Sequence, residues 1–187
     1  MQLTNRQTLP VSQVIAWEAL NDVEMLKASI PGCESLTPLG DDGYEVVVLA
    51  AIGPVKARFK GRLQLSDLQP PSSYRIAFEG QGGPAGHGKG TAEVRLEANG
   101  THETVLNYTA TARVGGKIAQ VGQRLVDAAA QRMAGEFFTN FDAQLRQRHA
   151  PAASSPGTGI AQAPTVGLWA RLKQWLRKLV APQGRSA

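Results

Sequence analysis

Residues 56–65 read Lys56-Ala57-Arg58-Phe59-Lys60-Gly61-Arg62-Leu63-Gln64-Leu65, with polar side chains at even positions and small or apolar ones at odd positions. A period of two is typical of a β-strand with one face in water and one face buried. Three further segments alternate in the same way, at 74–79, 93–97 and 106–112. Residues 44–52 are more uniformly apolar, which indicates a strand covered on both sides or placed where the sheet folds. One-sided alternation predicts an antiparallel sheet with one wet and one dry face.

Helical patterns stand on either side of these strands. Ser12 is suited to cap a helix over 13–20, and a second short helix is expected at 22–28. A long helix is expected from about Gly116 to Arg148, because apolar side chains recur there every three or four residues. This helix is the natural cover for the dry face of the sheet. The predicted fold class is therefore α+β, with a curved antiparallel β-sheet wrapped around a long C-terminal α-helix.

The dry face and the long helix contain many small residues, among them Ala57, Gly61, Ala110 and Ala129. Small side chains there would leave an internal apolar cavity for a hydrophobic small molecule. The same residues would also serve close packing of sheet against helix, so both interpretations stay open. From strand parity and helix phase, the predicted ligand-binding residues are Phe59, Leu63, Ile76, Phe78, Leu96, Tyr108, Val121, Leu125, Met133 and Phe137.

The charge of the chain is divided unevenly along its length. Residues 1–142 hold 13 Lys and Arg against 15 Asp and Glu, a net of −2, and residues 143–187 hold 7 and none, which together give the total of +5. Within the basic part, residues 168–180 place large apolar side chains on one helical face and cations on the other. Thirteen residues rise only about 20 Å, too little to span a bilayer.

An amphipathic helix with two Trp residues and four cations suits the interface of an anionic membrane. Docking on the protein's own body or in a partner's groove is the alternative, and a nucleic-acid arm would not need the apolar stripe. The predicted membrane-binding residues are Leu168, Trp169, Arg171, Leu172, Lys173, Trp175, Leu176, Arg177, Lys178 and Leu179.

Composition divides the chain into four parts. We expect a ligand-binding domain over 1–148, a flexible Pro-, Ala- and Ser-rich linker over 149–165, the amphipathic helix over 166–181 and a disordered tail over 182–187. The N-terminus lacks the apolar run of a secretory signal, and a single cysteine, Cys33, allows no internal disulfide. The expected location is cytoplasmic, peripheral on the inner face of the cell membrane.

The sequence gives little indication of a catalytic site. Cys33 and the three histidines belong to no recognisable catalytic motif, so we predict no catalytic residue, no metal site and no covalent cofactor. The glycine-dense run Gly80–Gly90 lacks the spacing of a Rossmann fingerprint or a P-loop. It is interpreted as a mobile hairpin turn, or as a loop at the cavity mouth in which His87 and Lys89 meet a ligand or a partner.

Several short segments, taken in order, resemble the CoxG family of carbon monoxide dehydrogenase proteins, within the START-like (SRPBCC) superfamily. They are Ile30-Pro31-Gly32-Cys33-Glu34, Gly53-Pro54-Val55, Phe59-Lys60-Gly61, the Gly80–Gly90 run and Gly116-Lys117-Ile118-Ala119-Gln120-Val121-Gly122. The resemblance covers residues 1–147, and the linker and tail are similar to those of members with a C-terminal membrane helix. It implies the helix-grip fold.

The resemblance also implies a non-catalytic accessory of a molybdenum hydroxylase-type CO dehydrogenase. Such a protein would recruit or couple the oxidoreductase to the membrane and bind a respiratory quinone, menaquinone or ubiquinone, for electron transfer. A START-like enzyme, a cyclase or hydrolase acting on a bound hydrophobic substrate, is the alternative. The inward strand positions carry almost no ionisable groups beyond the hydroxyls of Tyr74 and Tyr108, which favours carriage over catalysis.

Overall fold

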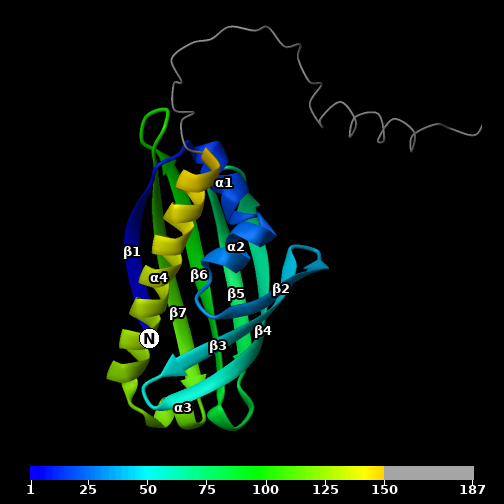
Figure 1. The fold of residues 1–187 in the computed structure, drawn as a ribbon, viewed down its shortest axis with the longest axis vertical. Helices are drawn as coiled ribbons and strands as arrows, with labels where there is room; N and C mark the ends of the chain where they lie inside the picture. The colour runs from blue at the N-terminus through cyan, green and yellow to red at the C-terminus, as the bar shows by residue number, and fades with distance from the viewer. Residues whose placement is uncertain (150–187) are drawn as a thin grey trace, which may run out of the picture. The chain divides into compact units, whose positions relative to one another are not determined.

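The computed structural model describes residues 1–149, and Figure 1 shows how its strands and helices are arranged. The elements in chain order are β1 (Gln2–Leu9), α1 (Gln13–Leu20), α2 (Val23–Ser29), β2 (Cys33–Gly40), β3 (Gly43–Ile52), β4 (Val55–Gln69), β5 (Ser73–Gln81), the 3-10 turn η1 (Gly83–Ala85), β6 (His87–Ala98), β7 (Thr104–Gly115), α3 (Lys117–Gln120) and α4 (Gln123–His149). The predicted α+β class is confirmed.

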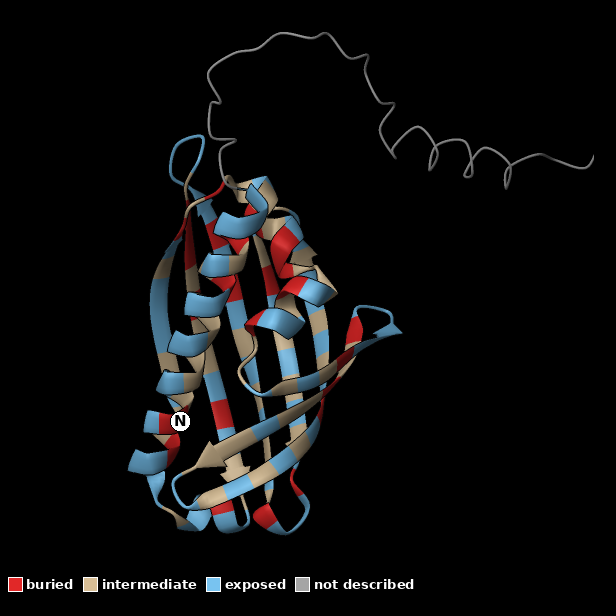
Figure 2. Ribbon diagram, viewed as in Figure 1, coloured by how far each residue is buried: buried red, intermediate tan, exposed pale blue. Residues whose placement is uncertain are grey.

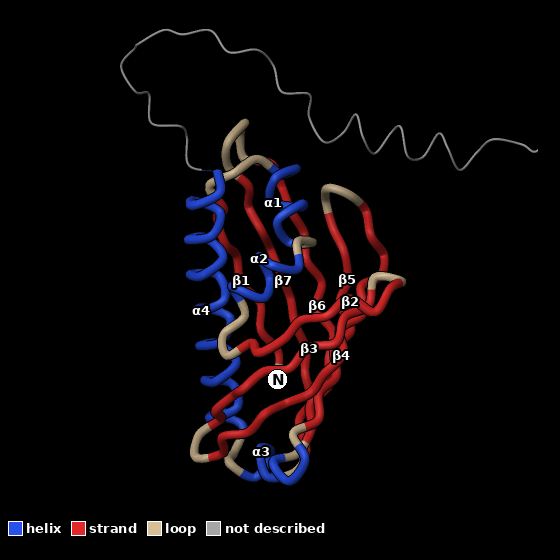
Figure 3. The backbone as a smooth tube through the Cα atoms, turned by 45° about the vertical axis from the view of Figure 1, so that its right-hand side comes forward, coloured by secondary structure: helices blue, strands red, loops and turns tan. Residues whose placement is uncertain are grey.

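The strands form one antiparallel sheet in the order β1-β7-β6-β5-β4-β3-β2. Apart from β1, each strand pairs with the next strand along the chain, because short turns join them as hairpins. β1 closes the other edge on β7, with Gln2 opposite Thr111 and Leu9 opposite Thr104. The sheet bends so strongly that β2 and β3 pass in front of β5 to β7, and α4 runs along the inner side (Figures 1 and 3).

Strand β2 was not predicted. Its sequence, Cys33-Glu34-Ser35-Leu36-Thr37-Pro38-Leu39-Gly40, does not alternate, and the register on β3 shifts twice along its length. Pro38 has no N–H to donate, which is tolerated because β2 lies at the edge of the sheet. An irregular edge strand gives no period-two signal.

The long helix predicted from Gly116 to Arg148 is broken into α3 and α4. The break lies at Gly122, whose φ of 97° is outside the helical region and favours glycine. Ser12 does precede α1, although its side chain makes no capping hydrogen bond. Asp22 does cap α2, and its side chain accepts a hydrogen bond from Met25 N at 2.9 Å.

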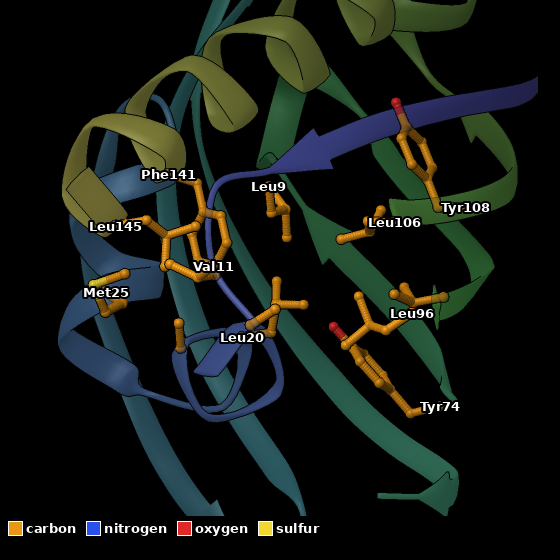
Figure 4. Packing of buried hydrophobic residues seen from close by; sticks show 13 residues of the cluster. Leu9, Val11, Leu20, Met25, Tyr74, Leu96, Leu106, Tyr108, Phe141 and Leu145 are labelled. Atoms are coloured by element: carbon orange, nitrogen blue, oxygen red, sulfur yellow. The ribbon is translucent and has the colours of Figure 1, made fainter. Parts of the chain in front are cut away.

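A cluster of fully buried side chains fills the end of the domain beneath α1, α2 and the last turns of α4 (Figures 2 and 4). Phe141 and Leu145 of α4 are completely buried, and Trp17 meets Tyr74 edge to face at 5.5 Å between ring centroids. We call this cluster the closed core. Its members are Leu9, Val11, Ala16, Ala19, Leu20, Met25, Tyr74, Val94, Leu96, Leu106, Tyr108, Phe141 and Leu145.

Candidate ligand-binding site

The inner face of the sheet, which faces α4, is apolar from β4 to β7. Leu63 of β4 lies opposite Phe78 of β5, and Ile76 of β5 lies opposite Ala92 of β6, which in turn faces Ala110 of β7. Side chains of directly opposed residues lie on the same face of an antiparallel pair. The inward positions predicted from the alternation of these strands are therefore confirmed.

Two glycines on this face allow close approach. A Cβ on Gly90 would lie 2.7 Å from Cζ of Phe78, and a Cβ on Gly61 would lie 2.6 Å from the carbonyl oxygen of Glu79. Real Cβ atoms do not come so close to such neighbours, and a Cβ on Gly90 would also lie 2.1 Å from the carbonyl oxygen of Thr111. Any other residue would therefore displace the Phe78 ring or the backbone of β5 or β7. The glycines thus allow neighbouring strands and the Phe78 ring to pack closer than any other residue would permit.

Beyond the closed core, Val46 and Ala112 of the inner face are buried, but several other inner-face apolar side chains are only half-buried. We call these strand residues the inner zone: Val48, Phe59, Leu63, Ile76 and Phe78. They point toward the interior and yet keep accessible surface, whereas Leu96 and Leu106 of neighbouring strands are nearly completely buried. Apolar surface that faces inward but is not yet covered is where a hydrophobic ligand gains most from contact.

Three of the residues predicted from the helical pattern are partly covered. Val121, just before α4, and Met133 and Phe137 within it are half-buried. The Phe137 ring stacks on Phe141 with centroids 5.7 Å apart, so it stands at the border between the closed core and the inner zone. Leu125 is different because its side chain is 45% exposed.

Leu125 packs instead on the turn between β3 and β4. A Cβ on Gly53 of that turn would lie 3.2 Å from Cδ1 of Leu125. Leu125 is thus more exposed than the other residues predicted on this helix.

Leu96 and Tyr108 also lie outside the inner zone. Both point inward as predicted, but they are only 2% and 9% exposed and belong to the closed core. The Tyr108 ring stacks on Phe138 at 5.3 Å, and its buried hydroxyl has no hydrogen-bond partner among the described residues. Strand parity predicts the face of a side chain but not which end of the sheet the helices cover.

Inner-face positions on β3 were missed. Val46 lies opposite Gly61, Val48 opposite Phe59, and Ala50 opposite Ala57, so all three share the inner face. A uniformly apolar sequence does not show which residues of a strand face inward. The tight turn at 53–54 does show it, because a hairpin that pairs Ile52 with Val55 fixes every later pair of β3 and β4.

The glycine-dense run is shorter as a loop than predicted. Gly80 and Gln81 belong to β5 and residues 87–90 belong to β6, so only residues 82–86 connect the strands. His87 and Lys89 lie on the outer face, since they pair with Gln81 and Glu79, which point away from α4. Neither side chain faces the inner zone, which corrects the interpretation that they meet a ligand there.

The inner face of β3 to β7 carries no Asp, Glu, Lys, Arg or His, and its only ionisable groups are Tyr44, Tyr74 and Tyr108. Burial raises the pKa of Tyr74 and of Tyr108, so both hydroxyls stay neutral. Burial also raises the pKa of the Cys33 thiol, and nearby Lys27 only partly opposes this. Neither Tyr74 nor Tyr108 is therefore poised to exchange a proton near neutral pH.

Two findings concern the described residues as a whole. Within residues 1–149, no three His, Cys, Asp or Glu side chains are grouped so that they could hold a metal ion. No helix in that range is long and apolar enough to cross a membrane. The predicted linker, the amphipathic helix over 166–181 and its membrane-binding residues lie outside the described range.

Comparison with protein families finds one match. The family model of the carbon monoxide dehydrogenase protein CoxG matches residues 9–146. A comparison with curated protein sequences finds no match.

Solved structures share the fold. A conserved protein from Geobacillus kaustophilus is 29% identical with a TM-score of 0.75, and the alignment covers 80% of this chain and 97% of that one. A START superfamily protein from Mycobacterium smegmatis is 13% identical, with a TM-score of 0.61 over 79% of this chain and 98% of that one. The Zhui aromatase/cyclase of a Streptomyces species is 17% identical, with a TM-score of 0.59 over 82% and 98%. The fold is thus START-like.

Proposed function

Because the chain belongs to the CoxG family of carbon monoxide dehydrogenase proteins, we propose that it is a non-catalytic accessory protein that carries a respiratory quinone and couples a molybdenum CO dehydrogenase-type oxidoreductase to the membrane. Family and fold together support the coarser role, which is that of a ligand-binding accessory. The quinone, the hydroxylase partner and the place at the cytoplasmic membrane surface are the finer parts of the proposal.

The observation that carries the proposal is the inner zone. Its side chains are apolar, point inward and remain half-buried, while the inner face of the strands that bear them carries no Asp, Glu, Lys, Arg or His. A quinone ring with a prenyl tail is mostly hydrocarbon and gains from such a surface. Each Å² of apolar surface removed from water stabilises a complex by about 25 cal/mol.

Catalysis on a bound substrate is the second candidate, since one structural neighbour is an aromatase/cyclase. At 17% identity that likeness concerns the fold alone. A cyclase needs proton donors and acceptors that reach its substrate, and the inner face has only tyrosine hydroxyls whose pKa burial raises. Carriage requires none of these groups.

The proposed membrane attachment depends on the sequence of the tail. Two Trp residues and four cations on opposite faces of a short helix suit reversible binding to an anionic bilayer surface. Reversible attachment fits an accessory protein that must meet both a lipid-soluble ligand and a soluble enzyme.

Extraction of the purified chain with organic solvent, followed by mass spectrometry, tests ligand carriage. We expect a quinone in the extract and saturable uptake of added menaquinone. Ala92→Leu adds bulk on the inner face and should lower uptake, whereas Ala77→Leu adds the same bulk on the exposed outer face and should not. Folded protein that takes up no quinone would refute carriage, and equal uptake by both variants would refute the inner zone as its site.

Co-sedimentation with vesicles tests attachment. Trp169→Glu with Trp175→Glu should release the chain from anionic vesicles, while the same two positions changed to Phe should keep most of the binding. Unchanged sedimentation of the Glu variant would show that the tail is not a membrane anchor.

A further inference from the structure

The outer face of the sheet carries a row of charged side chains across four strands. Arg62 of β4 lies opposite Glu79 of β5, Glu79 opposite Lys89 of β6, and Lys89 opposite Arg113 of β7. Opposed residues in antiparallel strands have Cβ atoms about 5 Å apart. The row therefore holds three cations and one carboxylate within a short distance.

This row lies along a groove of about 980 Å³ on the outer face. The floor is formed by the next row of residues, Ala77, Thr91 and Thr111, which are small and uncharged. The groove extends to the hairpin between β2 and β3, where Leu39 is 54% exposed. We call it the outer groove. Small residues on the floor with long cations beside them make a hollow with a positively charged side.

Glu79 and Asp41 also line the outer groove, but its cations form no ion pair within the described part of the chain. Neighbouring outer-face cations do pair: Arg58 with Glu34 at 2.7 Å and Lys60 with Glu45 at 3.2 Å. Within residues 1–149, none of Arg62, Lys89 and Arg113 has a carboxylate within 4 Å.

Lys89 and Arg113 are moreover directly opposed like charges, an arrangement that destabilises an antiparallel pair. An anionic group placed between them would remove this repulsion. The free protein therefore carries an unfavourable interaction that a bound anion would relieve.

We propose that the outer groove binds an acidic segment of a protein partner, whose carboxylates lie against Arg62, Lys89 and Arg113. Charge complementarity favours an acidic occupant, and it excludes the chain's own C-terminal region, since residues 143–187 carry seven cations and no carboxylate. A protruding protein segment can enter a hollow, whereas the headgroups of a flat bilayer can reach only its rim. The identity of the partner rests on the proposed function, because the oxidoreductase that the accessory serves is the natural source of such a segment.

Fluorescence anisotropy with a labelled peptide of alternating Glu and Ser tests the outer groove on the full chain, at about 0.15 M salt. Lys89→Thr with Arg113→Thr should weaken peptide binding about tenfold. Arg6→Thr with Arg95→Thr is the matched control, because it removes the same charge from the same outer face outside the groove and should change binding little. Equal weakening by both pairs would overturn the proposal.

Chemical cross-linking localises the contact. A carbodiimide joins a lysine amine to a Glu carboxylate as an amide and takes up the water that is released. Peptide mapping should find this link at Lys89. Links found only at Lys173 and Lys178 would overturn the proposal.

The Lys89→Thr, Arg113→Thr variant should unfold at an equal or higher urea concentration than the native chain, as relief of repulsion requires. If it instead loses binding to anionic vesicles and the peptide does not bind, the groove is a membrane contact and the proposal is wrong.

Discussion

Replacing Asp22 should separate the N-terminal cap of α2 from the ion pair that joins α2 to the end of α4. Its Oδ1 accepts a hydrogen bond from Met25 N at 2.9 Å and caps α2, and its Oδ2 lies 2.9 Å from Nη1 of Arg148. Asn caps a helix about as well as Asp. Asp22→Asn therefore removes only the ion pair, whereas Asp22→Ala removes the cap as well.

The expected magnitudes follow from exposure. The side chains of Arg148 and Asp22 are 41% and 40% exposed, so water screens the pair and its loss should cost about 0.5 kcal/mol. Loss of the cap should add about 1 kcal/mol. We expect Asp22→Ala to lower the melting temperature by about 5 °C and Asp22→Asn by less than half of that.

The assay is urea and thermal unfolding of both variants. Arg148→Gln is the matched control, because it removes the same ion pair by changing the other partner. The pKa of Asp22 is lowered below its usual 3.8, mainly by the hydrogen bond from Met25 N and in addition by Arg148. The stabilisation is therefore complete above about pH 4 and is lost as the pH falls through the lowered pKa. If Asp22→Asn proves as damaging as Asp22→Ala, the cap contributes nothing and the reasoning is wrong.

Four further substitutions have predictable effects on unfolding in urea. Gly90→Ala should destabilise by about 1–3 kcal/mol because its Cβ would collide with neighbouring strands, whereas Gly135→Ala, with nothing within 4 Å on the exposed side of α4, should stabilise by up to about 1 kcal/mol. Phe141→Ala should cost about 3–5 kcal/mol, since the ring is completely buried; a cost below 1 kcal/mol would contradict the closed core. Thr104→Val should cost about 1–2 kcal/mol by removing the buried hydrogen bond that Thr104 Oγ1 donates to the Val11 carbonyl at 2.8 Å, and an unchanged midpoint would refute this.

Much of the fold follows from local patterns in the sequence. The period of two in β4 to β7 predicts which side chains face inward, and the spacing of apolar residues predicts α1, α2 and most of α4. Two features escape such patterns. β2 is an irregular edge strand, and the break at Gly122 depends on one residue with positive φ.

The site is less predictable than the fold. Phe59, Leu63, Ile76 and Phe78 were placed correctly on the inner face, because parity needs only the strand itself. Whether an inward residue is covered depends on where α1, α2 and α4 come to lie, which no local pattern contains. For this reason Leu96, equally inward in parity, belongs to the closed core.

The division of the interior along α4 has a consequence for the dynamics of the domain. Amide hydrogens near the completely buried Phe141 and Leu145 should exchange only through global unfolding, while those around half-buried Met133 should exchange through smaller openings. A guest molecule could then enter and leave at one end while the other end keeps the chain folded. Substitutions that adapt the domain to a different guest can accumulate near Met133 at little risk to folding.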